Sequence, residues 1–155
     1  MTWVELLLAG SLCASRTPAP ACSCLLGPPL TTRRAVAETV AAFDAVFEGV
    51  VVASTVELDS AVRGPGEPPY RWRELRATVA VSRRWKGAPA DTVVVTTPLQ
   101  GTMCGVDFAE GGRYLIFASD DGPRGLGTTS CTPTVAWGRE AKRLSRLLGP
   151  PAPRR

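Results

Sequence analysis

The sequence contains no histidine among its 155 residues. This absence removes the commonest general base, the usual ligand of a catalytic zinc ion, and the base of Ser–His and Cys–His nucleophile pairs. Adjacent carboxylates occur at Asp120 and Asp121, but Gly122 and Pro123 follow them directly, a pattern typical of a turn. We therefore expect the protein not to be an enzyme and to use no cofactor of its own.

Aromatic residues are also scarce, at 6% of the chain, and no apolar run is long enough to span a bilayer. Binding of single-stranded nucleic acid needs aromatic stacking platforms, whereas Trp72, Trp85, Tyr114 and Phe117 are better explained as core or strand-face residues. The net charge of +4 is the balance of 16 arginines and two lysines against 14 acidic residues, and the cations are spread without a basic block, which indicates a solvated surface. We expect no nucleic-acid partner and no transmembrane segment.

The first 21 residues resemble a secretory leader. Val4 to Ala14 form an apolar run of suitable length, and Ala19-Pro20-Ala21 matches an A-x-A cleavage pattern. The sequence therefore predicts a signal peptide over residues 1–21, a mature chain that begins at Cys22, and secretion. One alternative is a frayed apolar N-terminus or a short core element, and another is a lipid anchor on Cys22. The lipid anchor is disfavoured because Ala19-Pro20-Ala21 lacks the aliphatic residue expected three positions before a lipid-modified cysteine and contains a proline.

Five cysteines are present, and removal of the leader takes Cys13 away and leaves Cys22, Cys24, Cys104 and Cys131. An even number of cysteines in an exported domain predicts two disulfides. A bond between Cys22 and Cys24 would constrain almost nothing, so two pairings remain, each tying the N-terminus to chain about 80 to 110 residues away. A structural zinc site is the alternative, but the usual C-x-x-C knuckles are missing.

Hydrophobic periodicity predicts two helices and five strands. The first helix covers Arg33 to Phe43 with Thr31 or Thr32 as its cap, and the second covers Trp137 to Leu148. β-branched and alternating segments, separated by Gly/Pro turns, predict strands at 46–56, with a possible bulge at Gly49, and at 71–85, 92–97, 113–119 and 126–130. Residues 60–70 read as a polar excursion able to act as a binding loop.

Short strands, few helices and frequent turns predict an all-β fold with accessory helices. Specifically, we expect a five-stranded OB-fold-like Greek-key barrel, with one helix near the N-terminus and one at the C-terminus. The domain spans residues 22–148, and the Pro/Arg-rich residues 149–155 are expected to form a disordered tail.

Five pieces of the sequence stand in a distinctive order: Cys22-Ser23-Cys24, Asp44 to Gly49, Val81 to Gly87 ending in Trp85-Lys86-Gly87, Met103-Cys104-Gly105 with Arg113 to Phe117, and Thr129 to Pro133 with Trp137. Together they resemble the netrin-like module, and specifically the N-terminal inhibitory domain of the tissue inhibitors of metalloproteinases. The likeness covers residues 22–145, and the ordered set is more specific than any one piece.

This resemblance implies the disulfides Cys22–Cys104 and Cys24–Cys131. It also implies that the free α-amino group and carbonyl oxygen of Cys22 bind the catalytic zinc of a target enzyme, with the Ser23 side chain in the adjoining substrate pocket. The implied target-binding residues are Cys22, Ser23, Cys24, Leu25, Thr102, Met103 and Cys104.

The resemblance thus implies a secreted inhibitor, acting as a monomer, whose partner is a zinc metalloproteinase. The alternative is a non-inhibitory extracellular netrin-like module that serves in binding or scaffolding, in which the disulfides only staple the N-terminus. A free amino group on Cys22 distinguishes the two, because acylation blocks zinc binding.

Overall fold

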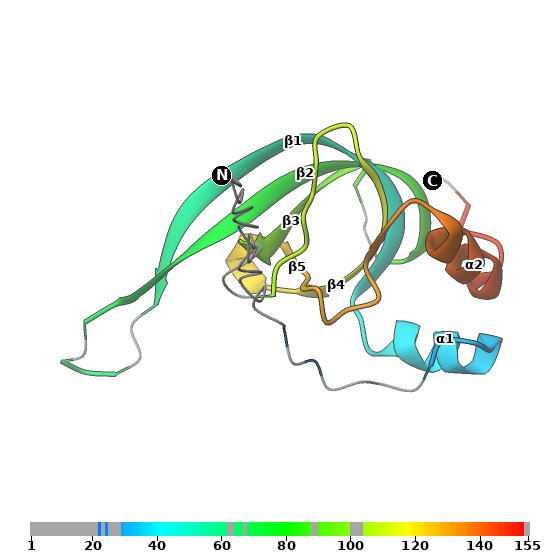
Figure 1. The fold of residues 1–155 in the computed structure, drawn as a ribbon, viewed down its shortest axis with the longest axis horizontal. Coiled ribbons are helices and arrows are strands. Elements are labelled where there is room, and N and C mark those ends of the chain that lie inside the picture. The colour runs from blue at the N-terminus through cyan, green and yellow to red at the C-terminus, as the bar shows by residue number, and fades with distance from the viewer. Residues whose placement is uncertain are drawn as a thin grey trace, which may run out of the picture.

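The computed structural model of the chain describes residues 22, 24, 29–61, 64–66, 68–87, 90–99 and 104–153. In this part the chain is mainly β structure, with one α-helix near each end (Figure 1). No described helix has the length and hydropathy needed to cross a membrane. The elements in chain order are α1 (Arg33–Ala41), β1 (Ala45–Ala61), β2 (Tyr70–Lys86), β3 (Thr92–Pro98), β4 (Arg113–Asp120), the 3₁₀ turn η1 (Gly122–Arg124), β5 (Leu126–Gly127), β6 (Val135–Ala136) and α2 (Arg139–Leu148).

Strands β1 to β5 close into a ring. β1 pairs with β2, β2 with β3, β3 with β5, β5 with β4, and β4 returns to β1. The β3–β5 pairing is parallel and the others are antiparallel. This order confirms the expected five-stranded barrel of the OB type. The expected strand count was one too low for the described chain, because β6 adds two residues to the free edge of β4, too few to give a sequence signal.

Helix α1 begins as the sequence predicts. The Thr32 side chain accepts a hydrogen bond from the backbone N–H of Ala35, which satisfies one of the first free donors of the helix. The helix ends at Ala41, two residues before the predicted end. Lys86 from β2 donates hydrogen bonds to the carbonyl oxygens of Val40 and Ala41, so a residue distant in sequence caps the last turn.

The predicted bulge at Gly49 is present. The β1–β2 register shifts between Glu48 and Gly49, and a Cβ at this glycine would overlap the Val79 side chain and lie 2.6 Å from the Ala80 carbonyl oxygen. Only glycine therefore allows β2 to approach β1 at this point, where the strand bends into the barrel.

Beyond the barrel, β1 and β2 continue as a long hairpin that projects away from the two helices (Figure 1). The pairing runs to Ala61 opposite Tyr70. Between these two residues, the described positions 64–66 form a turn and 68–69 lie outside any strand, as expected for an excursion at 60–70. Two apolar side chains on this hairpin, Val56 and Leu58, are 43% and 65% exposed.

The core has two parts because β1 and β4 face a layer on each side. The interior of the barrel is filled by Ala45, Phe47, Val51, Ala77, Val79, Val95, Phe108, Tyr114, Ile116 and Ala118. The layer between the barrel and the two helices contains Val36, Val46, Leu115, Phe117, Ala141 and Leu144. Alternate residues of each strand enter opposite layers, as the period of two requires.

Residues 149–153, which belong to the segment predicted to be disordered, lie against β2. The Trp85 indole N–H donates a 2.8 Å hydrogen bond to the carbonyl oxygen of Gly149. The backbone N–H of Ala152 donates a 2.7 Å bond to the carbonyl oxygen of Arg84. One side-chain and one backbone hydrogen bond to β2 thus hold this proline-rich stretch in place, although its sequence has no helical or strand periodicity.

Candidate functional site

Two disulfides fix the C-x-C pair to the barrel. Cys22 is bonded to Cys104 and Cys24 to Cys131, with Cα–Cα distances of 5.5 and 5.3 Å. They close loops with sequence separations of 82 and 107 residues. Of the two pairings that the spacing left open, this is the one that the family resemblance implies.

The two anchor cysteines are themselves held together. The backbone N–H of Ser130, next to Cys131, donates a 2.8 Å hydrogen bond to the carbonyl oxygen of Cys104. Two residues after Cys104, the N–H of Val106 donates a 2.9 Å bond to the hydroxyl of Thr97 on β3. Cys104 has a φ of 60°, in the left-handed region that non-glycine residues rarely occupy. The C-x-C pair, Cys22 and Cys24, is therefore attached to chain that is already fixed to the barrel.

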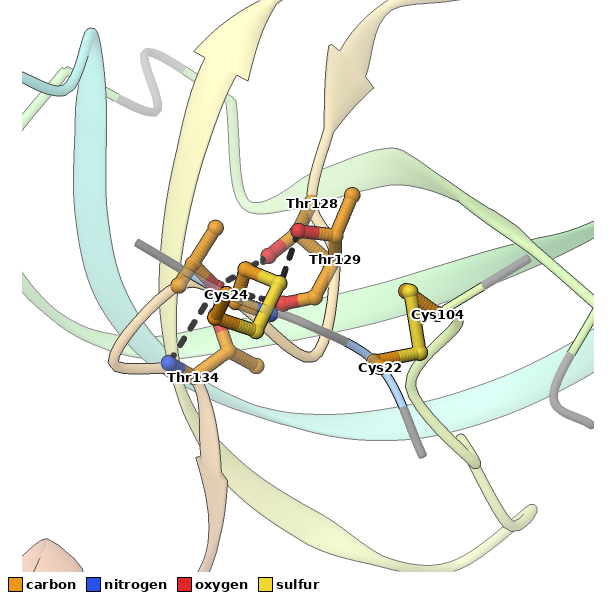
Figure 2. The surroundings of a disulfide bond; sticks show 8 residues. Cys22, Cys24, Cys104, Thr128, Thr129 and Thr134 are labelled. Carbon is orange, nitrogen blue, oxygen red and sulfur yellow. Dashed lines mark hydrogen bonds between the residues drawn. A yellow bond between two sulfur atoms is a disulfide. The ribbon is translucent and has the colours of Figure 1, made fainter. Parts of the chain in front are cut away.

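A cluster of threonine hydroxyls supports the Cys131 segment. Figure 2 shows both disulfides, with Thr128, Thr129 and Thr134 gathered around Cys24. Thr128 donates to the carbonyl oxygen of Phe117 on β4, and Thr134 accepts from the N–H of Phe117, each at 2.9 Å. On the side that faces β4, these side chains take the place of backbone ladder bonds beyond the end of β5. For this reason β5 stops at Gly127, whereas the β-branched run predicted a strand to Ser130.

We expect Thr134→Val to lower the free energy of unfolding by about 1–3 kcal/mol, because it leaves the buried N–H of Phe117 without its acceptor. Urea unfolding monitored by tryptophan fluorescence measures the change. Thr129→Val is the matched control, with an expected loss below about 1 kcal/mol, since water can replace the Thr129 bond to the N–H of Cys131. Equal losses in both variants would contradict the buried role of Thr134.

The structure brings together four of the residues that the sequence assigns to target binding or disulfides. Cys22 is exposed, Cys24 and Cys104 are half-buried, and Cys131 is exposed. The remaining four predicted target-binding residues lie outside the described residues: Ser23, Leu25, Thr102 and Met103.

A pocket of about 350 Å³ adjoins the Cys131 segment, and no sequence pattern indicated it. It lies among the ends of β2 and β3, the β4–β5 connection and the segment after β5. Its described lining consists of Trp72, Glu74, Thr96, Thr97, Pro98, Ser119, Asp120, Asp121, Arg124, Gly127, Thr128, Thr129 and Thr132.

An ion-pair network crosses this pocket. Arg124 lies 2.7 Å from Asp121, 3.4 Å from Asp59 and 3.6 Å from Glu74, and its guanidinium carbon is 5.8 Å from the centre of the Trp72 ring. Burial opposes the charge, but the carboxylates of Asp121, Glu74 and Asp59 outweigh it and raise the pKa of Arg124 above its ordinary value. Asp120 and Asp121 form the turn that the sequence predicts, and Asp121 in addition holds this arginine.

Comparison with models of known protein families and with curated proteins gives no match to this chain.

Proposed function

We propose that the mature chain is a secreted inhibitor of zinc metalloproteinases, and that the α-amino group and carbonyl oxygen of Cys22 cap the catalytic zinc of the target. The observation that supports the proposal is an exposed Cys22 held by a disulfide to Cys104, two residues before a second disulfide from Cys24 to Cys131. The resemblance to the tissue inhibitors of metalloproteinases supplies the chemistry.

A catalytic zinc ion keeps one coordination position for water beside its three protein ligands. The amino nitrogen and carbonyl oxygen of one terminal residue are spaced to close a single chelate ring on the metal in place of that water. An unperturbed α-amino group has a pKa of about 7.7–8.0, so an appreciable neutral fraction with a free lone pair exists at pH 7. In this role the chain is not an enzyme and uses no cofactor of its own.

Rigidity decides whether such weak ligands give a tight complex. A free chain end loses conformational entropy when it is ordered on a partner, at a cost of about 0.5–1.5 kcal/mol per immobilised side chain. Here Cys22 and Cys24 are bonded to segments that are in turn hydrogen-bonded to each other. Most of this entropy is therefore lost during folding, which favours binding of the terminus because it is already ordered.

The test compares the secreted protein with a variant that carries one alanine inserted between Ala21 and Cys22. Intact-mass analysis first establishes whether the mature chain starts at Cys22 with an unmodified amine. Inhibition constants are then measured against a panel of zinc metalloproteinases. We expect the inserted alanine to weaken inhibition by about 100-fold or more, because it moves the amine away from the metal. An alanine added after Arg155 is the matched control and is expected to change nothing.

Equal inhibition by the extended and natural forms would contradict zinc capping. An absence of inhibition by either form across the panel would favour the alternative, an extracellular netrin-like binding or scaffold module. A mass that corresponds to an acylated cysteine would exclude chelation and indicate a lipid-anchored protein.

A further inference from the structure

We propose that the pocket beside the Cys131 segment binds an arginine side chain of a partner protein. The pocket is separate from the Cys22 amine, and its binding of a guanidinium group does not depend on zinc capping. Four observations support it: the position of the pocket in the barrel, a 4% exposed carboxylate (Glu74) to which no described residue donates a hydrogen bond, the charge of the lining, and the way in which Arg124 is held.

The pocket occupies the ligand face of this type of barrel. Five-stranded Greek-key barrels of the OB type bind ligands across strands 2 and 3, between the loop that joins strands 1 and 2 and the loop that joins strands 4 and 5. Here Trp72 and Glu74 come from β2, Thr96 and Thr97 come from β3, and Asp121 comes from the β4–β5 connection. A volume of about 350 Å³ is near the lower end of the range for small-ligand pockets, roughly 300–1,000 Å³.

Glu74 is the buried acceptor of the pocket. It is 4% exposed, and its nearest described cations are Arg124 at 3.6 Å and Arg76 at 4.0 Å. Both distances exceed the 2.7–3.2 Å range of an N–H···O hydrogen bond, and no described residue donates one to this carboxylate. Buried carboxylates normally accept several hydrogen bonds, so Glu74 has unused capacity for a ligand with N–H donors.

The lining selects for positive charge. Three carboxylates (Glu74, Asp120 and Asp121) and one guanidinium (Arg124) line the described part of the pocket, which gives it a net charge of −2 on a chain whose net charge is +4. An anionic ligand would meet three like charges in a partly desolvated site. A cationic group would meet carboxylates on more than one side.

Arg124 shows that the site is compatible with a guanidinium group. Asp121 holds its guanidinium at 2.7 Å, and Asp59 lies at 3.4 Å. The same guanidinium lies near the Trp72 ring, within the 6 Å range of a cation–π contact. An incoming arginine would find the same chemistry on Glu74, and its planar fork suits bidentate binding to a carboxylate better than a lysine ammonium does.

The segment that adjoins the pocket indicates that the guanidinium belongs to a protein partner. Thr129 and Thr132 line the pocket on either side of Cys131, which is bonded to Cys24. A protein docked on the N-terminal pair would therefore reach the pocket with a side chain. This step alone rests on the proposed function.

The test uses Nα-acetyl-arginine methylamide as a probe and the isosteric but neutral citrulline derivative as its control. Titration is monitored by ¹H–¹⁵N spectra, in which the indole N–H of Trp72 reports on the pocket. We expect saturable binding of the arginine probe with a dissociation constant in the millimolar range, and at least about tenfold weaker binding of citrulline. Added salt should weaken the arginine complex.

Two variants of the pocket are expected to change the affinity for the arginine probe in opposite directions. Glu74→Gln should weaken the arginine probe by about tenfold or more, whereas Glu38→Gln, which removes the same charge from α1, should leave it unchanged. Arg124→Ala should strengthen binding severalfold, because it removes the one competing guanidinium among the described lining residues. This second variant keeps the test open if Glu74→Gln does not fold.

Equal binding of the arginine and citrulline derivatives, or no movement of the Trp72 signal at about 10 mM probe, would overturn the proposal. Binding of sulfate that is lost in Arg124→Ala would also overturn it and point to an anionic ligand. The variant with alanine inserted before Cys22 should bind the arginine probe as the natural protein does. The failure of zinc capping and the failure of arginine binding can therefore be told apart.

Discussion

Replacing Cys24 and Cys131 together by serine is expected to lower the free energy of unfolding by about 4–5 kcal/mol. The bond closes a loop with a sequence separation of 107 residues, and the chain-entropy model gives about this value for a loop of that length. Since small domains are stable by only about 5–15 kcal/mol, the loss is a large part of the total. Urea unfolding of both forms, with the Cys22–Cys104 bond intact by mass, measures it.

Ser130→Ala is the matched control, because it changes an exposed neighbour of Cys131 and removes no covalent link. It is expected to alter stability by less than about 0.5 kcal/mol. A loss below about 1 kcal/mol in the double serine variant would mean that the hydrogen bonds of the Cys131 segment already fix it. If zinc capping is correct, the double variant should also inhibit more weakly while still folded, since Cys22 would then be held at one point only.

The sequence predicted the parts of this fold that local pattern controls. Alternation of apolar residues located β1 to β4, and the switch from an Ala-rich helix to β-branched residues placed the start of β1 within one residue. The glycine at position 49 marked the bulge, because no other residue fits between β1 and β2 there. These features depend on neighbours in sequence or on a single steric requirement.

The ends of the short elements were not predictable in the same way. β5 was expected to reach Ser130 but ends at Gly127, because the Thr128 hydroxyl bonds to Phe117 on another strand. Helix α1 ends early because Lys86 caps it from β2. In each case a contact with another strand, and not the local sequence pattern, decides the boundary.

The pocket could not be predicted from the sequence either, because it depends on contacts between distant segments. Trp72 and Glu74 lie about 50 residues before Asp121 and Arg124, and each pair alone reads as an ordinary strand face or turn. Only the closure of the barrel brings the pairs together. The disulfides, in contrast to the pocket, could be narrowed down from the sequence, because a cysteine forms a disulfide only with another cysteine, whatever the fold.

Glu48 gives the second large prediction. It lies within the strand residues of β1 and is fully buried, although its neighbours Phe47 and Gly49 suggested only an ordinary alternating strand. Arg113 reaches one carboxylate oxygen, with its Nε at 2.6 Å, and Arg83 lies 2.7 Å from the other. The guanidinium carbon of Arg113 is 3.9 Å from the centre of the Trp137 ring, so an aromatic ring covers this ion pair.

The double variant Arg83→Gln/Arg113→Gln is expected to lower the free energy of unfolding by about 3–5 kcal/mol, because it leaves a buried carboxylate without compensation. Glu48→Gln should cost less, about 1–3 kcal/mol. The two arginine side chains are 40% and 41% exposed, so water can solvate them once the carboxylate is gone. The order of the two losses therefore follows from which partner is buried.

Urea unfolding of both variants and of Arg34→Gln measures this order. Arg34 pairs with Glu38 on the surface of α1, where the two side chains are 89% and 61% exposed, and its replacement should cost less than about 0.5 kcal/mol. If Glu48→Gln proved as costly as the double arginine variant, the carboxylate itself would be stabilising the barrel through its hydrogen bonds from Ser82 and Arg113. A loss below about 1 kcal/mol in the double arginine variant would contradict the prediction. It would mean that water solvates the Glu48 carboxylate once the two arginines are gone, so that its burial does not require them.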